Sequence, residues 1–300
     1  MTRQVPNEQA IRKHTRELLK RAGINGEFPT PVDHIIAVVG LREPTESLLS
    51  GLVIGEAPEH LRRALRKIIP GRVRAILDRK EREIHVDPTI HNKGRLAFNR
   101  LHEVAHEIFP WQTELGYADD DATLAPSVKD LFEQEANIGA SNLLFQHETF
   151  NSLANEFAIS HASILALSQI VGASGHATFR RFVQSDKRIV AGIVMELEPC
   201  SWDPLAYRRR EVLVSKKWAT QFGSPASWPR ILRPQPYSFV NLAESARLSK
   251  TVVQTEITLP NLQNEMVSLR VEIYSNQHHL FVLIGRYGKQ RLKRHRIIVP

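Results

Sequence analysis

The segment His102-Glu103-Val104-Ala105-His106 combines residue types that can bind a metal ion and move protons. On a helix, residues four positions apart share a face, so both imidazoles can point at one ion while Glu103 lies at the edge of the site. Histidine nitrogens are common zinc ligands, and a glutamate in this second position acts as a general base in zinc-dependent hydrolysis. The motif therefore predicts a zinc site with His102 and His106 as ligands and Glu103 as the base.

The motif is rarer than this composition would produce by chance. With 13 histidines among 300 residues, two histidines four apart are expected about 0.6 times, and a glutamate directly after the first lowers this to about 0.04. The alternative is a surface helix that carries two ordinary histidines. A helix is predicted in either case, because apolar residues recur near every 3.6 positions until Pro110, namely Leu96, Ala97, Leu101, Val104, Ala105 and Ile108.

A catalytic zinc site needs a third protein ligand and one open position. Two carboxylates follow the motif in a segment with helical character, Glu133 and Glu135. Glu133 would share a helix face with Asn137 and Ala140, and Asn137 could orient a ligating histidine through its second nitrogen. Glu135 would point about 200° away around the helix, so it is the second choice for the ligand. For each glutamate alone, a solvated surface position is the alternative.

Local signals predict the elements that hold these residues. A capping-box pattern at Ser127 and Asp130 predicts that the carboxylate helix starts there and runs to about Phe145. Upstream, periodicity predicts helices over residues 11–22 and 32–39, and alternating segments predict a hairpin over residues 72–78 and 82–86.

Four segments continue the pattern around the motif: residues 95–106, 109–111, 133–137 and 143–145. Together they resemble the ImmA/IrrE family of metallo-endopeptidases, over roughly residues 8–185 of this chain. Family members carry His-Glu-x-x-His on one helix and a downstream Glu-x-x-Ala-Asn or Glu-x-x-Ala-Asp that gives the third ligand, so the resemblance favours Glu133 over Glu135. The chain departs from the family pattern at Phe145-Gln146, where methionine and proline are common, and at Ala105, where glycine is usual.

The resemblance and general zinc chemistry together imply hydrolysis of a peptide bond with zinc (Zn2+) as cofactor. Zinc would lower the pKa of a water molecule to about 7, and Glu103 would take its proton and deliver it to the leaving amine. The resemblance further implies a protein substrate, a helix-turn-helix transcriptional repressor whose cleavage relieves repression. Tyr117, His147 and His161 are candidates for stabilising the oxyanion, with a structural role as the alternative for each.

The alternative function is a DNA-binding transcriptional regulator. Residues 153–160 and 161–171 have the outline of a helix-turn-helix. The usual glycine of the turn is absent, and the second helix offers no arginine or lysine to the bases, only His161, Ser163, Ser168 and Gln169. The alternative interpretation of the same segment is a helical pair packed against the peptidase domain.

Beyond residue 188, β-like segments dominate and a proline-rich stretch interrupts them. Strands are predicted over residues 189–197, 211–215, 251–258, 267–274 and 280–286. The predicted fold is therefore α+β, with a zincin-like helical peptidase domain containing a small sheet (residues 1–149), a helical helix-turn-helix-like segment (150–188) and a basic, mixed β-rich C-terminal domain (189–300). A ligand-sensing role is a further hypothesis for this last domain, and nothing in its sequence identifies a ligand.

Charge and composition narrow the classes of partner. Residues 201–300 hold 16 Lys+Arg against 6 Asp+Glu, and a basic run from Arg286 to Arg296 could meet nucleic acid or an acidic partner, although a solvated terminus is the simpler reading. The single cysteine, Cys200, excludes an internal disulfide and a cysteine-based zinc site. The polar N-terminus and the short apolar runs predict a cytoplasmic protein with no membrane partner.

Overall fold

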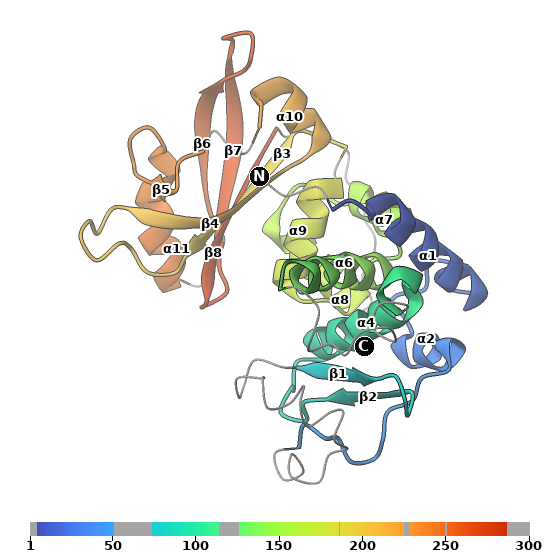
Figure 1. The fold of residues 1–300 in the computed structure, drawn as a ribbon. Helices are drawn as coiled ribbons and strands as arrows, with labels where there is room; N and C mark the ends of the chain where they lie inside the picture. The colour runs from blue at the N-terminus through green and yellow to red at the C-terminus, as the bar shows by residue number, and fades with distance from the viewer. Residues whose placement is uncertain are drawn as a thin grey trace. The chain divides into compact units, whose positions relative to one another are not determined.

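The structure, a computed structural model, describes residues 5–50, 74–113, 126–185, 187–224, 228–249 and 251–286. Over this part the chain is a mixture of helix and sheet, which confirms the predicted α+β class (Figure 1). It divides into two compact units, one of Met1–Phe150 with Gln169–Ser174 and one of Asn151–Ser168 with Gly175–Pro300. The zincin-like architecture and the three-part domain division stay predictions.

The first unit contains a helical group and a two-stranded hairpin. Its elements are α1 (Glu8–Arg21), α2 (Val32–Val39), β1 (Ala75–Asp78), β2 (Glu83–Val86), α4 (Lys93–Ile108) and α6 (Pro126–Leu144). The strands are antiparallel, with Ala75 opposite Val86 and Asp78 opposite Glu83. The predicted helices and hairpin are thus present, and residues 72–73 of the hairpin prediction lie outside the described residues.

Helix α4 begins and ends where its sequence dictates. The Asn92 side chain accepts a hydrogen bond from the backbone N–H of Arg95, an N-cap that satisfies one of the unpaired donors of the first turn. At the other end Phe109 is extended, with φ −93° and ψ 105°, because the residue before a proline is pushed out of the helical region. Residues 110–113 then form a single helical turn that brings the chain back beside the helix.

The start of α6 differs from the sequence expectation. The helix includes Pro126, so Ser127 lies in its first turn and is not the N-cap that the capping-box pattern predicted. Proline is favoured in the first helical position because it has no N–H to leave unpaired there and its φ is already helical. The end of α6 at Leu144 agrees with the prediction.

Helices α4 and α6 pack closely through small residues. A Cβ atom on Gly139 would lie 2.7 Å from Ala105 Cβ and 2.7 Å from Phe109 Cζ, so only glycine fits at this crossing. Ala136 and Ala140 are fully buried beside it. The closest approach of the two helices is therefore made at Gly139.

The second unit is built on a six-stranded antiparallel sheet with strand order β5-β4-β3-β8-β7-β6. Its strands are β3 (Val190–Glu196), β4 (Tyr207–Val214), β5 (Ile231–Leu232), β6 (Val253–Pro260), β7 (Met266–Ser275) and β8 (His279–Gly285). The helices of this unit and of the connection to it are α7 (Glu148–Glu156), α8 (His161–Val171), α9 (Gly175–Ser185), α10 (Lys216–Phe222), the 3-10 helix η2 (Ser238–Leu242) and α11 (Ala243–Ser249).

Both faces of this sheet are covered, and side-chain alternation along β3 shows how. Ala191, Ile193 and Met195 belong to the main core, which η2 and α11 complete with Phe239 and other apolar residues. Gly192 points to the other face, where an added Cβ would lie 2.6 Å from Phe179 of α9. Because both faces are covered, a strand such as β3 is buried along nearly its whole length and appears in the sequence as a nearly continuous apolar run.

No helix in the described ranges is long and apolar enough to span a bilayer.

Candidate metal centre

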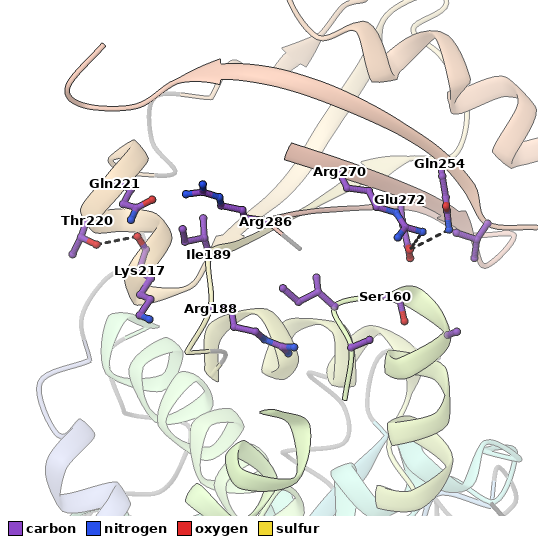
Figure 2. A pocket seen from close by; sticks show the side chains of 14 residues that line it. Ser160, Arg188, Ile189, Lys217, Thr220, Gln221, Gln254, Arg270, Glu272 and Arg286 are labelled. Atoms are coloured by element: carbon purple, nitrogen blue, oxygen red, sulfur yellow. Dashed lines mark hydrogen bonds and ion pairs between the residues drawn. The ribbon is translucent and has the colours of Figure 1, made fainter. Parts of the chain in front are cut away.

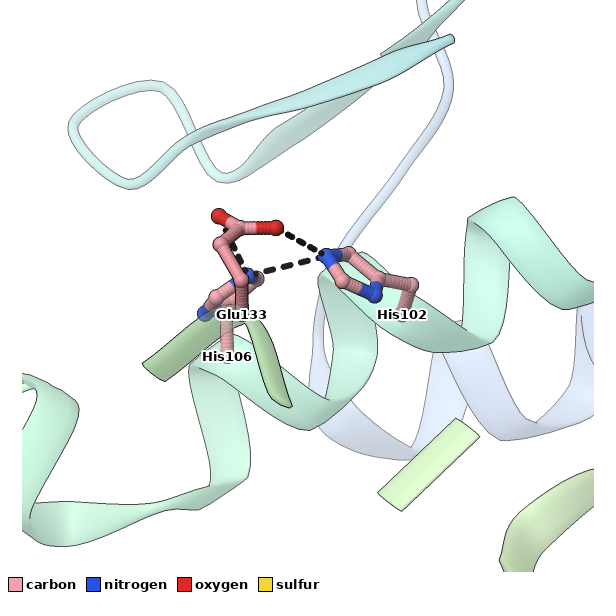
Figure 3. Close-up of side chains that lie close together, drawn as sticks. All are labelled: His102, His106 and Glu133. Atoms are coloured by element: carbon pink, nitrogen blue, oxygen red, sulfur yellow. Dashed lines mark hydrogen bonds and ion pairs between the residues drawn. The ribbon is translucent and has the colours of Figure 1, made fainter. Parts of the chain in front are cut away.

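Three side chains of the first unit converge on one point. His102 Nε2 and His106 Nε2 are 3.1 Å apart, and Glu133 Oε2 and Oε1 lie 3.2 Å and 3.6 Å from these two nitrogens (Figure 3). Donor atoms held 2.0–2.1 Å from one tetrahedral ion are separated by about 3.3 Å, so all three spacings match a zinc-sized site. The structure thus brings together the predicted ligands His102, His106 and Glu133, and this donor set could hold a metal ion.

The two helices make this convergence possible. His102 and His106 are one turn apart on α4, and the close crossing at Gly139 brings α6 near enough for Glu133 to reach them. Both histidine side chains are 15% exposed, whereas the Glu133 side chain is 51% exposed. The site is therefore open to solvent on the side of Glu133.

The charges in the site favour positive charge at its centre. Hydrogen bonds from His102 and His106 hold the pKa of Glu133 well below its usual range. Burial alone would lower the pKa of His106, but the hydrogen bond to Glu133 and the charges of Glu103 and Glu133 outweigh it and raise this pKa. The carboxylates of Glu103 and Glu133, which stabilise protonated His106, would also stabilise a bound cation.

Glu103 lies beside the triad, and the residue is 7% exposed. Burial raises its pKa, and the nearby His106 and His102 oppose that shift, which places the carboxylate within electrostatic reach of both histidines. A carboxylate with a raised pKa is suited to take up a proton and give it away again near neutral pH.

A chain of hydrogen bonds fixes the orientation of His106. Gln112 Oε1 lies 2.7 Å from His106 Nδ1, and Gln112 Nε2 donates to Glu135 Oε2 at 2.7 Å. Because the amide N–H group of Gln112 points at a carboxylate, its oxygen must be the group that faces the histidine, so Nδ1 carries the proton. In the neutral imidazole that binds a metal, the lone pair of Nε2 is then directed at the ligand position.

Glu135 anchors this network. The residue is fully buried, and besides Gln112 its carboxylate accepts hydrogen bonds from Asn7 Nδ2 at 2.8 Å and Trp111 Nε1 at 2.7 Å. Its oxygens are occupied by these three donors. Glu135 is therefore a support for the site in this structure and is not one of the converging ligand atoms.

Asn137 does not have the orienting role that its spacing suggested. Its side chain is exposed, and the partner of His106 Nδ1 is Gln112. The sequence offered no spacing rule for Gln112, because its position depends on the turn formed by residues 110–113. Trp111 belongs to residues 109–111, one of the segments that carry the family resemblance. Its indole N–H donates to Glu135, so this segment helps to hold the residues that support the site.

The hairpin is tied to the end of the metal helix by two arginines, Arg79 and Arg82. Arg79 Nη2 donates to the carbonyl oxygen of His106 at 3.2 Å, where a cation is favourable at a helix C-terminus. Arg82 Nη1 donates to Glu107 Oε1 at 2.8 Å. The carbonyl of a ligand residue is thus held from outside the helix.

The structure describes two of the three residues considered for the oxyanion, His147 and His161. His147 is buried, with Nε2 2.9 Å from Thr15 Oγ1. His161 is buried in the second unit, where its Nε2 lies 3.3 Å from the carbonyl of Glu272. Tyr117 and most of the basic run that follows Arg286 lie outside the described residues. Neither buried histidine is among the atoms that converge on the triad.

Comparison with known proteins gives a fold relationship. No protein-family model matches the chain, and no curated protein matches it. The fold is shared with a solved structure. A Mycobacterium tuberculosis transcriptional regulator superimposes with a TM-score of 0.52, at 9% sequence identity, over 92% of this chain and 75% of that one. At this identity the similarity shows a common fold alone.

Helix α8 is poorly suited to read DNA bases. Of the four polar residues that the sequence placed on this helix, His161, Ser163 and Ser168 are buried, while Gln169 is exposed. A recognition helix needs several polar side chains directed at base edges. Because three of the four polar side chains of α8 are buried, they cannot contact base edges.

Proposed function

We propose that the chain is a zinc-dependent endopeptidase of the ImmA/IrrE kind, with His102, His106 and Glu133 as metal ligands and Glu103 as the general base. The observation that carries the proposal is the convergence of two imidazole nitrogens and one carboxylate at zinc-ligand spacing. A buried glutamate lies beside them, and the exposed side of Glu133 leaves the approach that a peptide needs.

The chemistry divides between the cofactor and the protein. A zinc ion held by the three ligands would act as a Lewis acid that lowers the pKa of a water molecule to about 7 and polarises the scissile carbonyl. Glu103 accepts the proton of the attacking water and returns it to the amine nitrogen of the leaving peptide. Burial of Glu103 stabilises its protonated form between these two transfers. Gln112 and Glu135 keep His106 in the tautomer that serves as a ligand.

The proposed substrate is a helix-turn-helix transcriptional repressor whose cleavage relieves repression. A peptidase without an energy-driven unfolding module cuts segments that are exposed or locally unfolded, which limits its targets. The resemblance of residues 8–185 to the family supports this substrate class, and the basic C-terminal region would help to collect an acidic partner.

The test is to incubate the purified protein with the repressor encoded beside it, with zinc or with a chelator. We expect one cut that the chelator abolishes and that Glu103→Gln does not make. If the protein hydrolyses casein freely and leaves the repressor intact, the specific substrate is wrong and the protein is a general peptidase. Cleavage that persists both in the chelator and with Glu103→Gln would rule out the metal mechanism.

A second candidate function is DNA-binding transcriptional regulation. One observation favours it, the shared fold with a protein described as a transcriptional regulator. The burial of His161, Ser163 and Ser168 weighs against base reading by α8. A gel-shift titration at several salt concentrations separates the two, because sequence-specific binding persists at salt concentrations that remove purely electrostatic binding.

A further inference from the structure

The second unit contains a cavity of about 860 Å³ that is separate from the metal centre. It is formed by the segment before and at the start of α8, the residues just before β3 and just after β8, helix α10, and neighbouring strands β6 and β7 (Figure 2). This volume lies within the range of about 300–1,000 Å³ that small-molecule sites occupy in proteins.

One side of the cavity is strongly basic. Lys217, Arg286 and Arg188 lie there, while Glu272 with Arg270 and Gln254 lies on the opposite side (Figure 2). Among the residues that the structure describes, the side chains of Lys217 and Arg286 form no ion pair, and both residues are exposed. Arg188 is already held in place by the carbonyl of Phe157, to which its Nη1 donates at 2.8 Å.

The single carboxylate of the lining has its charge satisfied. Glu272 is 2% exposed and accepts a hydrogen bond from the backbone N–H of His161 at 2.8 Å, at the start of α8. Arg270 Nη2 and Gln254 Nε2 each lie 3.3 Å from Glu272 Oε1. The pair of Glu272 and Arg270 is close to neutral, so the excess charge of the cavity is positive and lies on the side of Lys217 and Arg286.

The rest of the lining is mostly apolar. It includes Ile159, Ile189 and Val252 and the small residues Ala158 and Ala162. Apolar lining with a few convergent polar groups is the usual character of a small-molecule site. A ligand that satisfies this lining needs both an apolar body and a negative group.

We propose that this cavity binds a small organic anion with an apolar body, such as an amphiphilic carboxylate, sulfonate or phosphate monoester. Its charged group lies between Lys217 and Arg286, and its apolar part covers Ile159, Ile189 and Val252. Thr220 and Gln221 on α10 border the charged end and offer hydrogen-bonding groups there. This activity goes beyond the proposed peptidase function and does not depend on it.

The test uses 8-anilinonaphthalene-1-sulfonate, a fluorescent aromatic anion, titrated into the full-length protein. We expect saturable binding of about one molecule per chain, weakened at least tenfold in the double variant Lys217→Ala/Arg286→Ala. Lys216→Ala is the matched control, because this neighbouring exposed lysine does not line the cavity, and it should change affinity less than twofold. Equal affinity of the double variant and the control would overturn the proposal.

Two further arms locate the probe and define its chemistry. Ala162→Trp fills the cavity from an exposed position, so it should abolish saturable binding while circular dichroism stays unchanged. Octanoate should displace the probe and 1-octanol at the same concentration should not. Undiminished binding to Ala162→Trp would place the probe elsewhere, and equal displacement by octanol would show an apolar site without anion preference; either result contradicts the proposal.

Discussion

At the scale of single residues, Glu103 is where binding and chemistry separate. Its carboxylate is buried next to the triad but is not one of the converging ligand atoms. We predict that Glu103→Gln retains metal and fold and loses about 10²–10⁴ in peptidase rate, the usual contribution of a general acid–base group. Metal analysis and initial rates on the same preparation test this. Activity near that of the unmodified protein would refute the assigned role.

Gln112 acts through His106, so its effect should appear in metal affinity. Without the Gln112 amide, His106 loses the acceptor that fixes its tautomer. We predict that Gln112→Ala weakens zinc binding about 10–100-fold, as loss of an orienting partner does at other zinc sites. Competition with a chromophoric chelator measures the change. Gln134→Ala, at an exposed position on α6, is the matched control. Equal zinc affinities of the two variants would show that Gln112 does not orient His106.

His161 predicts how stability depends on pH. Burial lowers its pKa from 6.5 to about 4, so the unfolded chain takes up a proton before the folded chain does. Stability is then highest above pH 6.5 and falls as the pH drops toward 4, by about 3 kcal/mol in total.

The variant His161→Phe should reduce this pH dependence, because phenylalanine does not titrate. The fold should tolerate the new ring, since the ring of His161 already stacks on Phe179. Urea unfolding at pH 7 and pH 5, followed by tryptophan fluorescence, compares the two proteins. The same loss of stability between these pH values in both would show that another group is responsible.

At the scale of elements, the crossing of α4 and α6 sets the geometry of the triad. Alanine at position 139 would gain about 1 kcal/mol of helix propensity. Its Cβ would nevertheless lie 2.7 Å from Ala105 Cβ, and relieving such overpacking costs about 1–3 kcal/mol. We predict that Gly139→Ala lowers the melting temperature and also weakens zinc binding, because α6 carries Glu133. A stabilised protein with unchanged zinc affinity would contradict this view of the crossing.

The elements that the sequence predicted best are those with long, regular patterns. Helix α2 has the predicted limits, residues 32–39, and β3, β6, β7 and β8 agree within about two residues at each end. Helices α10 and α11 were not predicted, because seven residues each give too little periodicity. A local signal did exist for α10, since Ser215 Oγ accepts a hydrogen bond from the N–H of Trp218 as an N-cap.

The candidate site was predictable to the extent that its signals are local. His102 and His106 follow from helical spacing, and Glu133 follows from spacing with the help of the resemblance. The support behind them is not local, because Asn7 meets Glu135 across 128 residues of sequence. The bond from Gln112 to His106 depends on the turn that begins at Pro110, and helical periodicity says nothing about the path of a turn.

At the scale of the whole molecule, each unit carries its own candidate site. The donor atoms of the first unit fit a metal, and the cavity of the second unit fits an organic anion. The two proposals rest on different residues, and each can fail without the other. The basic character of residues 201–300 gives the cavity its excess charge in part, through Lys217 and Arg286.

The central claim is that His102, His106 and Glu133 hold one zinc ion. Metal analysis of the purified chain, of His102→Ala, His106→Ala and Glu133→Ala, and of the control Gln134→Ala tests it most directly. We predict about one zinc per chain in the unmodified protein and in Gln134→Ala, and loss of zinc in the other three folded variants. Retention of zinc by Glu133→Ala, or absence of zinc from the unmodified protein supplied with the ion, would contradict the assignment.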